Sequence, residues 1–254
     1  MELPIFQIDA FADAVFGGNP AAVCPLDRWL DTGVMQAIAA ENNLAETAFF
    51  VGTDGSYDLR WFTPTVEVDL CGHATLASAF AIFERLAPQT DRIRFLEVTR
   101  RDDGMIFLDF PAYPGPAVDC PDALSRGLDA DPVTVIEGPN YMAVFGAEAD
   151  IAAMAPDMDT IALLHPRGVI ATARGESCDF VSRYFGPSFG VPEDSVTGSA
   201  HCMLTPYWAR RLGRDRLDAR QISERGGRLV CEDRGDRVGI GGRAVLYLEG
   251  TITV

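Results

Sequence analysis

The side chains best suited to chemistry stand just before an apolar segment. Cys71, Gly72 and His73 precede the stretch "ATLASAFAIF", which has the composition of a buried helix. A helix N-terminus has backbone N–H groups without intrahelical partners and a partial positive charge. These residues therefore stand where a carboxylate could bind, with a thiol and an imidazole beside it.

This pattern occurs twice in the chain. The first copy reads "RWFTPTVEVDLCGHATLASAFAIFERL" and the second reads "RYFGPSFGVPEDSVTGSAHCMLTPYWARRL". Both begin Arg, aromatic, Phe, x, Pro, and both end in Arg-Leu, with Gly72 paired with Gly198 and Leu86 with Leu212. The loop before the glycine is longer in the second copy. Internal repetition of this kind predicts two similar structural units.

The repeat determines the predicted fold class and domains. We predict an α+β fold of two pseudo-symmetric α/β lobes, each a mostly antiparallel or mixed β-sheet or barrel around a central helix. The proline-rich stretch 111–119 separates them. The first lobe is expected at 1–115, joined by a C-terminal strand at about 247–254, and the second at 116–246. Pseudo-twofold symmetry would bring the two helix starts to one shared pocket.

Hydrophobic periodicity predicts the individual elements. A helix is expected over 31–43, where Asp31 can act as the N-cap. Its apolar stripe comprises Val34, Met35, Ile38 and Ala39. Strands are expected at 5–11, 47–51, 57–62, 105–110, 133–138, 141–146, 168–173, 179–185, 228–233, 237–242 and 245–254. The Asp/Gly-containing stretches "RRDDGM" and "EDRGDR" predict hairpin turns. Core positions in the first repeated helix are Leu76, Phe80 and Phe83.

Composition excludes several classes of function. A net charge of −16 would repel nucleic acid and anionic membranes, so neither is an expected partner. The uncharged run 71–83 is too short to span a bilayer. "MELPIFQIDAFAD" has no basic region before an apolar stretch, so no signal peptide is predicted. The six scattered cysteines contain no C-x-x-C pair, which is typical of reduced thiols in a cytoplasmic protein.

Several stretches together resemble the phenazine-biosynthesis isomerase (PhzC/PhzF) family, which has the diaminopimelate-epimerase-like fold. They are "IDAF", "FGGNPAAV", "NNLAETAFF", "RWFTPTVEVDLCGHAT", "FGVPEDSVTGSA" and "RGG" at 225–227. They occur in the family's order and cover nearly the whole chain. The resemblance implies a cofactor-independent isomerase that transfers a proton on a small carboxylic acid, as a homodimer.

The resemblance also implies the site residues. The glutamate of the family's "LSET" motif is its base and matches Glu46, and its "GH" motif matches Gly72 and His73. Its "EDPATGSA" motif matches "EDSVTGSA", which implies roles for Asp194 and Ser199.

The second motif departs from the family pattern at one point. Ser195 and Val196 replace the usual Pro-Ala, which removes a residue with a fixed φ but keeps the acid. Thr197 and Gly198 follow in the same stretch and, with Cys71, are expected to line the substrate.

Each of these residues also has an ordinary structural interpretation. Proton transfer from carbon needs a base with a near-neutral pKa, a range that carboxylates reach when an apolar pocket surrounds them. Glu46 enters an apolar strand, but an edge-strand glutamate facing water would look the same. His73 can relay a proton, or it can simply cap its own helix. Asp194 can hold an amine or donate a proton, or it can be an ordinary loop or N-cap aspartate. Ser199 can bind a carboxylate or be a capping serine.

Cys71 leaves an alternative open. Racemases and epimerases of the resembling fold use two cysteines, one at each helix start, whereas this chain has Cys71 at one and Thr197 at the other. Threonine is too weak an acid to be an equal partner, so Cys71 is interpreted as a small buried residue. The alternatives are a racemase, epimerase or dehydratase that depends on Cys71, and a binding protein without turnover.

Neither a metal site nor a nucleotide cofactor is predicted. Cys71 and His73 could converge with His201 and Cys202, but their spacing differs from the usual zinc patterns. No glycine-rich phosphate loop occurs between a strand and a helix. The site residues therefore point to chemistry without a cofactor.

Overall fold

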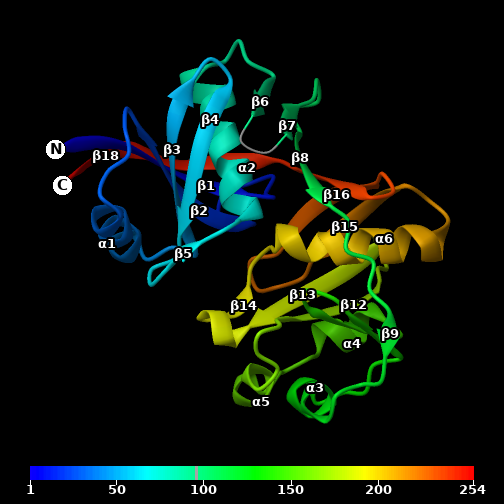
Figure 1. Ribbon diagram of the computed structural model, residues 1–254. Coiled ribbons are helices and arrows are strands. Elements are labelled where there is room, and N and C mark those ends of the chain that lie inside the picture. The colour runs from blue at the N-terminus through cyan, green and yellow to red at the C-terminus, as the bar shows by residue number, and fades with distance from the viewer. Residues whose placement is uncertain (95–96) are drawn as a thin grey trace. The chain divides into compact units, whose positions relative to one another are not determined.

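The computed structural model describes residues 1–94 and 97–254 (Figure 1). The chain forms two compact units. Unit 1 comprises Met1–Asp109 and Gly241–Val254, and unit 2 comprises Phe110–Ile240. No helix in the described part of the chain is long and apolar enough to cross a membrane.

Unit 1 is built from strands and two principal helices. Its strands are β1 (Glu2–Ala10), β2 (Asn19–Leu26), β3 (Glu46–Thr53), β4 (Ser56–Phe62), β5 (Glu67–Val68), β6 (Arg92–Arg94), β7 (Glu97–Arg100) and β18 (Ala244–Thr253). Its helices are α1 (Thr32–Asn42) and α2 (Gly72–Ala81), which continues as a π-helical turn, Ile82–Leu86. The strands β8 (Ile106–Pro111) and β17 (Arg237–Gly242) carry the chain between the units.

The strand pairing of unit 1 is mixed. β1 is antiparallel to both β18 and β2, β2 is parallel to β3, and β3 is antiparallel to β4. β4 then pairs with β5 antiparallel and with β6 parallel, and β6, β7 and β8 follow antiparallel. The β1–β18 ladder brings the chain ends together, where the N–H of Val254 donates to the Met1 carbonyl at 2.8 Å (Figure 1).

Both faces of the unit 1 sheet are covered. Side chains alternate between the two faces along a strand, so residues of odd and even number report on different faces. Leu3 and Ile5 of β1 belong to an apolar cluster that includes Met35 and Ile38 of α1. Phe6 and Ile8 have the opposite parity and are also buried. The strands β1, β2 and β3 pack against α2. The two helices therefore account for strands that are buried on both faces.

Unit 2 contains the second copy of the repeat. Its strands are β9 (Ala117–Val118), β10 (Thr134–Glu137), β11 (Tyr141–Val144), β12 (Val169–Arg174), β13 (Phe180–Gly186), β14 (Val191–Asp194), β15 (Arg216–Gln221) and β16 (Gly227–Asp233). Its helices are α3 (Asp122–Leu128), α4 (Glu148–Ala152), α5 (Met158–Ala162) and α6 (His201–Leu212), with 3₁₀ turns at Pro187–Phe189 and Gly198–Ala200.

The pairing order of unit 2 repeats that of unit 1. β10 is antiparallel to β9 and β11, β11 is parallel to β12, and β12 is antiparallel to β13. β13 then pairs with β14 antiparallel and with β15 parallel, as β4 does with β5 and β6. The strand beside β1 is β18, from the end of the chain, whereas the strand beside β10 is β9, which follows the junction.

An ion pair repeats with the strands. Arg60 of β4 forms two hydrogen bonds with Glu67 of β5, at 2.6 and 2.7 Å. Arg183 of β13 forms two with Glu193 of β14, at 2.7 and 2.8 Å. Both are the fork-to-fork arginine–carboxylate pair that fixes orientation. The internal repeat predicted from the sequence is thus present in topology and in side-chain contacts.

Most predicted elements are present, with a few corrections. Asp31 caps α1 as expected and accepts a hydrogen bond from the Gly33 N–H at 2.8 Å. Val34 was expected in the core but is 38% exposed, because only part of the α1 stripe faces the sheet. Phe80, also expected in the core, is only half-buried.

Several elements were not predicted from the sequence. The helices α3, α4 and α5 have seven residues or fewer, too short to show a helical apolar stripe. The strand β2 contains Pro20 and Pro25, which argue against a strand in sequence-based prediction.

Pro206 lies inside α6 and explains one contact of the proline-rich stretch. Proline has no N–H, so it cannot donate to the carbonyl four residues earlier, that of Cys202. The N–H of Tyr113 donates to this carbonyl instead, at 2.8 Å. The carbonyl left without an intrahelical donor by Pro206 therefore accepts a hydrogen bond from the proline-rich stretch.

Candidate active site

Three of the predicted site residues come together at one point of unit 1. Glu46 is the first residue of β3, Cys71 is the N-cap of α2, and His73 is the second residue of α2. The helix packs against β2 and β3, so its first turn lies near the start of β3. The carboxylate, the thiol and the imidazole offer atoms that all lie within 4.8 Å of one another.

His73 is the centre of this group. Its Nε2 lies 3.0 Å from Oε2 of Glu46, in an ion-pair contact that falls short of good hydrogen-bond geometry. Its Nδ1 lies 3.1 Å from Nδ2 of Asn19 and 3.4 Å from Sγ of Cys71. His73 is buried, whereas 16% of the Glu46 side chain is exposed. The buried imidazole therefore contacts the buried Oε2 of Glu46, while the Glu46 side chain as a whole is partly exposed.

The charges of the group depend on burial and on each other. Burial by itself would lower the pKa of His73, but the electrostatic and hydrogen-bond interactions with Cys71 and Glu46 outweigh it and raise this pKa well above 6.5. Burial raises the pKa of the Cys71 thiol, and the nearby Glu46 carboxylate adds to the effect. A thiol with a raised pKa stays protonated at neutral pH, so the charge on His73 rests mainly on Glu46.

Asn19 was not predicted as a site residue, although "FGGNPAAV" contributed to the family resemblance. It is the first residue of β2 and is buried beside His73. Its amide can donate to a neutral imidazole nitrogen or, after turning over, accept from a protonated one. The sequence signal was an isolated asparagine before a proline, which by itself is typical of a turn.

The remaining predicted residues lie in unit 2. Asp194 ends β14, and its Oδ2 accepts a hydrogen bond from the Thr197 hydroxyl at 2.6 Å. The buried Gln221 accepts from the Thr197 N–H at 2.8 Å and donates to the Asp194 carbonyl at 2.7 Å. Gln221 was not predicted, and it fixes the loop that presents the Asp194 carboxylate.

Ser199 does not cap the second repeated helix, α6. Gly198 is buried and opens a 3₁₀ turn, and Ser199 is exposed. The N-cap of α6 is Ala200, so Ser199 is not an ordinary capping serine. The ring Nδ1 of His201 lies 2.9 Å from the Thr197 carbonyl.

Strand register defines which residues of the two units are equivalent. Trp61 pairs with Val68 as Tyr184 pairs with Asp194, so Val68 is the counterpart of Asp194. Counting forward from these positions, Thr197 corresponds to Cys71, as predicted from the repeat, and the counterparts of His73 and Thr75 are Ser199 and His201. Thr75 donates to the Cys71 carbonyl, as His201 contacts the Thr197 carbonyl.

The four side chains considered above as metal ligands belong to two different units. Cys71 and His73 are joined by Glu46 in unit 1. His201 and Cys202 lie in unit 2, where the Nδ1 of His201 contacts a backbone carbonyl. The sulfur, nitrogen and oxygen donors of Cys71, His73 and Glu46 suit zinc better than magnesium or calcium.

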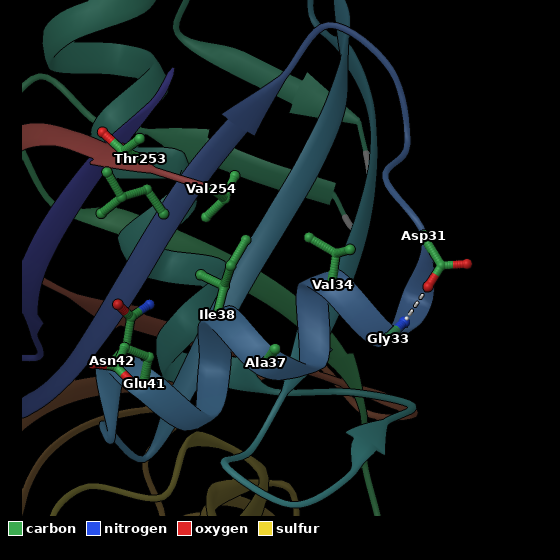
Figure 2. Close-up of a pocket in the computed structure, with 10 residues that line it drawn as sticks. Asp31, Gly33, Val34, Ala37, Ile38, Glu41, Asn42, Thr253 and Val254 are labelled. Atoms are coloured by element: carbon green, nitrogen blue, oxygen red, sulfur yellow. Dashed lines mark hydrogen bonds between the residues drawn. The ribbon is translucent and has the colours of Figure 1, made fainter. Parts of the chain in front are cut away.

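A separate pocket of about 660 Å³ lies in unit 1. Val34 and Ile38 of α1 line it together with the chain end at Thr253 and Val254 (Figure 2). None of the predicted site residues lines this pocket. The candidate site in unit 1 is therefore the group of Glu46, Cys71 and His73.

The arrangement of strands and helices is similar to that of racemases. A probable proline racemase from Agrobacterium radiobacter superposes with a TM-score of 0.59, at 10% identity, with 99% of this chain and 92% of that chain covered. At this identity the similarity shows the fold alone. The predicted α+β fold of the epimerase-like class is thus confirmed.

Sequence similarity identifies the family. The sequence model described as "Phenazine biosynthesis-like protein" matches residues 8–250. An uncharacterised isomerase of Pseudomonas aeruginosa is 54% identical over 258 residues, with 99% of both chains covered. A phenazine biosynthesis protein of the PhzF family from Enterococcus faecalis has a TM-score of 0.96 and 43% identity, with both chains fully covered.

The chain belongs to the phenazine biosynthesis-like (PhzC/PhzF) family. The resemblance inferred from the sequence motifs is confirmed, and so is the expectation of an isomerase.

Proposed function

We propose that this protein is a cofactor-independent isomerase that moves a proton on a small carboxylic acid, with Glu46 as the general base. The observation that carries the proposal is the contact of Glu46 with the buried His73, whose pKa is raised well above 6.5. The imidazole contacts the buried Oε2, and the Glu46 side chain is partly exposed, which suits a base that must reach a C–H bond.

The chemistry balances without an outside reagent. The Glu46 carboxylate takes a proton from carbon, and the electron pair left behind shifts into the substrate's unsaturated system. The resulting carboxylic acid then returns the proton to another carbon of the same molecule. His73 holds the carboxylate between the two transfers. The net reaction is an isomerisation in which one C–H bond breaks and another forms.

Residues of unit 2 are proposed to bind the substrate. Asp194, oriented by the Thr197 hydroxyl, would hold a hydroxyl or amino group or supply a proton. Gly198 and Ser199 would bind the substrate carboxylate through backbone N–H groups and the serine hydroxyl. In unit 1, Gly72 and Cys71 would line the substrate. We propose a cytoplasmic homodimer as the working form, which size-exclusion chromatography with light scattering would test.

A thiol mechanism is the second candidate, because Cys71 lies 3.4 Å from Nδ1 of His73. A cysteine beside a histidine is the usual arrangement of an activated thiol. Burial raises the pKa of this thiol, however, so little thiolate would be available at neutral pH. Its counterpart in unit 2 is Thr197, which cannot act as an equal second acid or base.

The deciding experiment follows solvent deuterium at the substrate carbon. A panel of small carboxylic acids with acidic C–H bonds is first screened by thermal shift, since a ligand that binds the folded state raises its stability. Proton NMR in D₂O then measures C–H exchange with the ligands found. Exchange is detected even where the equilibrium allows little net conversion.

Two variants separate the mechanisms. Glu46→Gln keeps the shape of the base but cannot take the proton, so it should lower the exchange rate about 10²–10⁴-fold. Cys71→Ala should exchange at close to the wild-type rate. Rapid exchange in Glu46→Gln, with loss in Cys71→Ala, would establish the thiol mechanism instead. Ligands that bind without any exchange in the wild-type protein would favour a binding protein.

A further inference from the structure

The cluster of Glu46, Cys71 and His73 has a second chemical capacity besides proton transfer. It combines a carboxylate, a thiol and an imidazole, the three side chains that bind zinc in proteins. In residues 1–94 and 97–254, it is the group of His, Cys, Asp and Glu side chains whose donor atoms come close enough to hold a metal ion. The three residues belong to two rigid elements, β3 and α2, so their spacing is set by the fold.

The distances fit a tetrahedral ion. With zinc bonds of about 2.0–2.3 Å, neighbouring ligand atoms in a tetrahedron lie about 3.4–3.6 Å apart. The Nε2 of His73 is 3.0 Å from Oε2 of Glu46 and 3.9 Å from Sγ of Cys71. Each of these two distances differs from the tetrahedral value by about 0.4 Å. The third pair, the Glu46 carboxylate and Sγ of Cys71, lies within 4.8 Å.

The surroundings also fit a metal ligand. When a histidine binds zinc through one nitrogen, the other usually donates to a nearby side chain or carbonyl that fixes the ring. Asn19 stands in that position, 3.1 Å from Nδ1 of His73, and its amide oxygen accepts after the amide turns over. The thiolate and the carboxylate together balance the two charges of the ion. The net charge of −16 raises the local concentration of cations.

We propose that Glu46, Cys71 and His73 form a three-ligand site for Zn²⁺ or a similar soft divalent ion, which inhibits the enzyme by occupying its base. The fourth position of the tetrahedron stays open to water or a substrate carboxylate, because three protein ligands leave it free. Binding replaces the thiol and imidazolium protons, which pass to solvent. The inhibitory effect rests on the proposed function of Glu46, whereas metal binding does not.

Binding is tested with metal-free wild-type protein and no substrate. Zn²⁺ affinity is measured by competition with a chromophoric chelator, and the stoichiometry should be one ion per chain. Co²⁺ serves as a visible probe, because a thiolate ligand gives it a near-ultraviolet charge-transfer band. We expect this band in the wild-type protein.

Matched variants identify the ligands. Cys71→Ser and Glu46→Gln should each weaken Zn²⁺ binding by more than roughly 10–100-fold. That range is the cost of losing a residue that only hydrogen-bonds to a metal ligand. Cys71→Ser should also remove the cobalt band. Cys120→Ser is the matched control, since Cys120 is an exposed free thiol outside the cluster, and it should behave as wild type. Thermal unfolding checks that each variant is folded, and Cys71→Ala replaces Cys71→Ser if the serine variant is not.

The outcomes separate this inference from the proposed function. Wild-type affinity in either Cys71→Ser or Glu46→Gln, or a cobalt band that survives Cys71→Ser, overturns the metal site whatever the catalytic result. If Glu46→Gln loses Zn²⁺ binding but keeps substrate exchange, the site stands and the role of Glu46 as base fails. If the metal site and the role of Glu46 as base are both confirmed, Zn²⁺ should inhibit exchange by the wild-type protein, and a chelator should restore the rate.

Discussion

His73 and His201 occupy the first turns of the two repeated helices, yet their surroundings shift their pKa values in opposite directions. In unit 1, the carboxylate of Glu46 and the thiol of Cys71 raise the pKa of His73 well above 6.5 despite its burial. In unit 2, burial lowers the pKa of His201 to about 4, and the one contact that opposes this is the Thr197 carbonyl. The comparison teaches that the helix start itself does not determine the charge, because neighbouring strands supply the deciding groups.

The missing carboxylate in unit 2 has a steric explanation. Thr47 pairs with Phe62 as Val169 pairs with Phe185, so the counterpart of Glu46 is Gly168. A Cβ at Gly168 would lie 2.2 Å from the hydroxyl of Tyr184, so a larger residue would require the Tyr184 side chain to move. Of these two equivalent positions, only the one in unit 1 therefore carries a carboxylate.

The largest predicted effect concerns the repeated arginine–glutamate ion pairs, which should contribute unequally to the stability of the protein. Arg183 and Glu193 are more buried than Arg60 and Glu67, and Arg183 also donates to the carbonyls of Ile151 and Met154. Arg183→Met should lower the free energy of unfolding by about 3 kcal/mol, because it leaves a half-buried carboxylate and two carbonyls without a donor. Urea unfolding measures this change.

The matched substitution in unit 1 is the control. Arg60→Met should cost about 1 kcal/mol or less, since that pair is largely screened by solvent. Equal costs for Arg60→Met and Arg183→Met would show that burial does not distinguish the two copies.

The next effect concerns His201 in acid. Its lowered pKa means that the unfolded chain binds a proton more readily, so stability is lost as the pH falls from 6.5 towards 4. The loss from this group should reach about 2 kcal/mol at pH 5. His201→Thr, which copies Thr75 of unit 1, should remove this part of the pH dependence. An unchanged slope of stability between pH 7 and pH 5 in the variant would refute it.

His73 should show the opposite pH dependence. Its raised pKa gives a stabilisation that is fully present below pH 6.5 and is lost as the pH rises through the folded-state pKa. The loss should be about 1.4 kcal/mol for each pKa unit by which the folded-state pKa of His73 exceeds its unfolded value. Glu46→Gln should flatten the stability profile on the alkaline side. A profile identical to wild type would mean that Glu46 does not hold the charge.

The smallest expected effect is that of Asn19. Asn19→Leu removes the amide beside Nδ1 of His73 and should cost about 1 kcal/mol. Its clearer signature is in imidazole ¹⁵N NMR, where the three histidines of the chain give few signals. The signals of His73 should shift and its titration should change, while those of His201 stay in place. Asn140→Leu in unit 2 is the control and should leave the signals of His73 unchanged.

The sequence predicted much of the fold because its signals are local or repeated. The apolar stripe and the Asp31 cap of α1, the strands at 57–62 and 179–185, and the repeated Arg-x-Phe-x-Pro segments all follow from residue spacing. The short helices of unit 2 were missed because one or two turns carry no periodic pattern. The strand β2 was missed because its prolines are tolerated only in this tertiary setting.

The candidate site was predicted residue by residue, but its contacts were not. Glu46 was favoured over an ordinary edge-strand glutamate by a motif alone, and the structure shows what the motif could not, its contact with His73. Gln221 and Asn19 were missed because their roles depend on partners far away in the sequence.

Composition and spacing in the sequence itself determined the two-unit repeat, the acidic surface and the presence of an acid, a thiol and an imidazole near the helix starts. Tertiary structure alone decided which of these meet. The pairing of β3 with β2 and the packing of α2 against both bring Glu46 to His73, 27 positions apart in the numbering of the chain. The charge of a histidine depends on distances of a few ångströms to such partners, and no local pattern of residues encodes those distances.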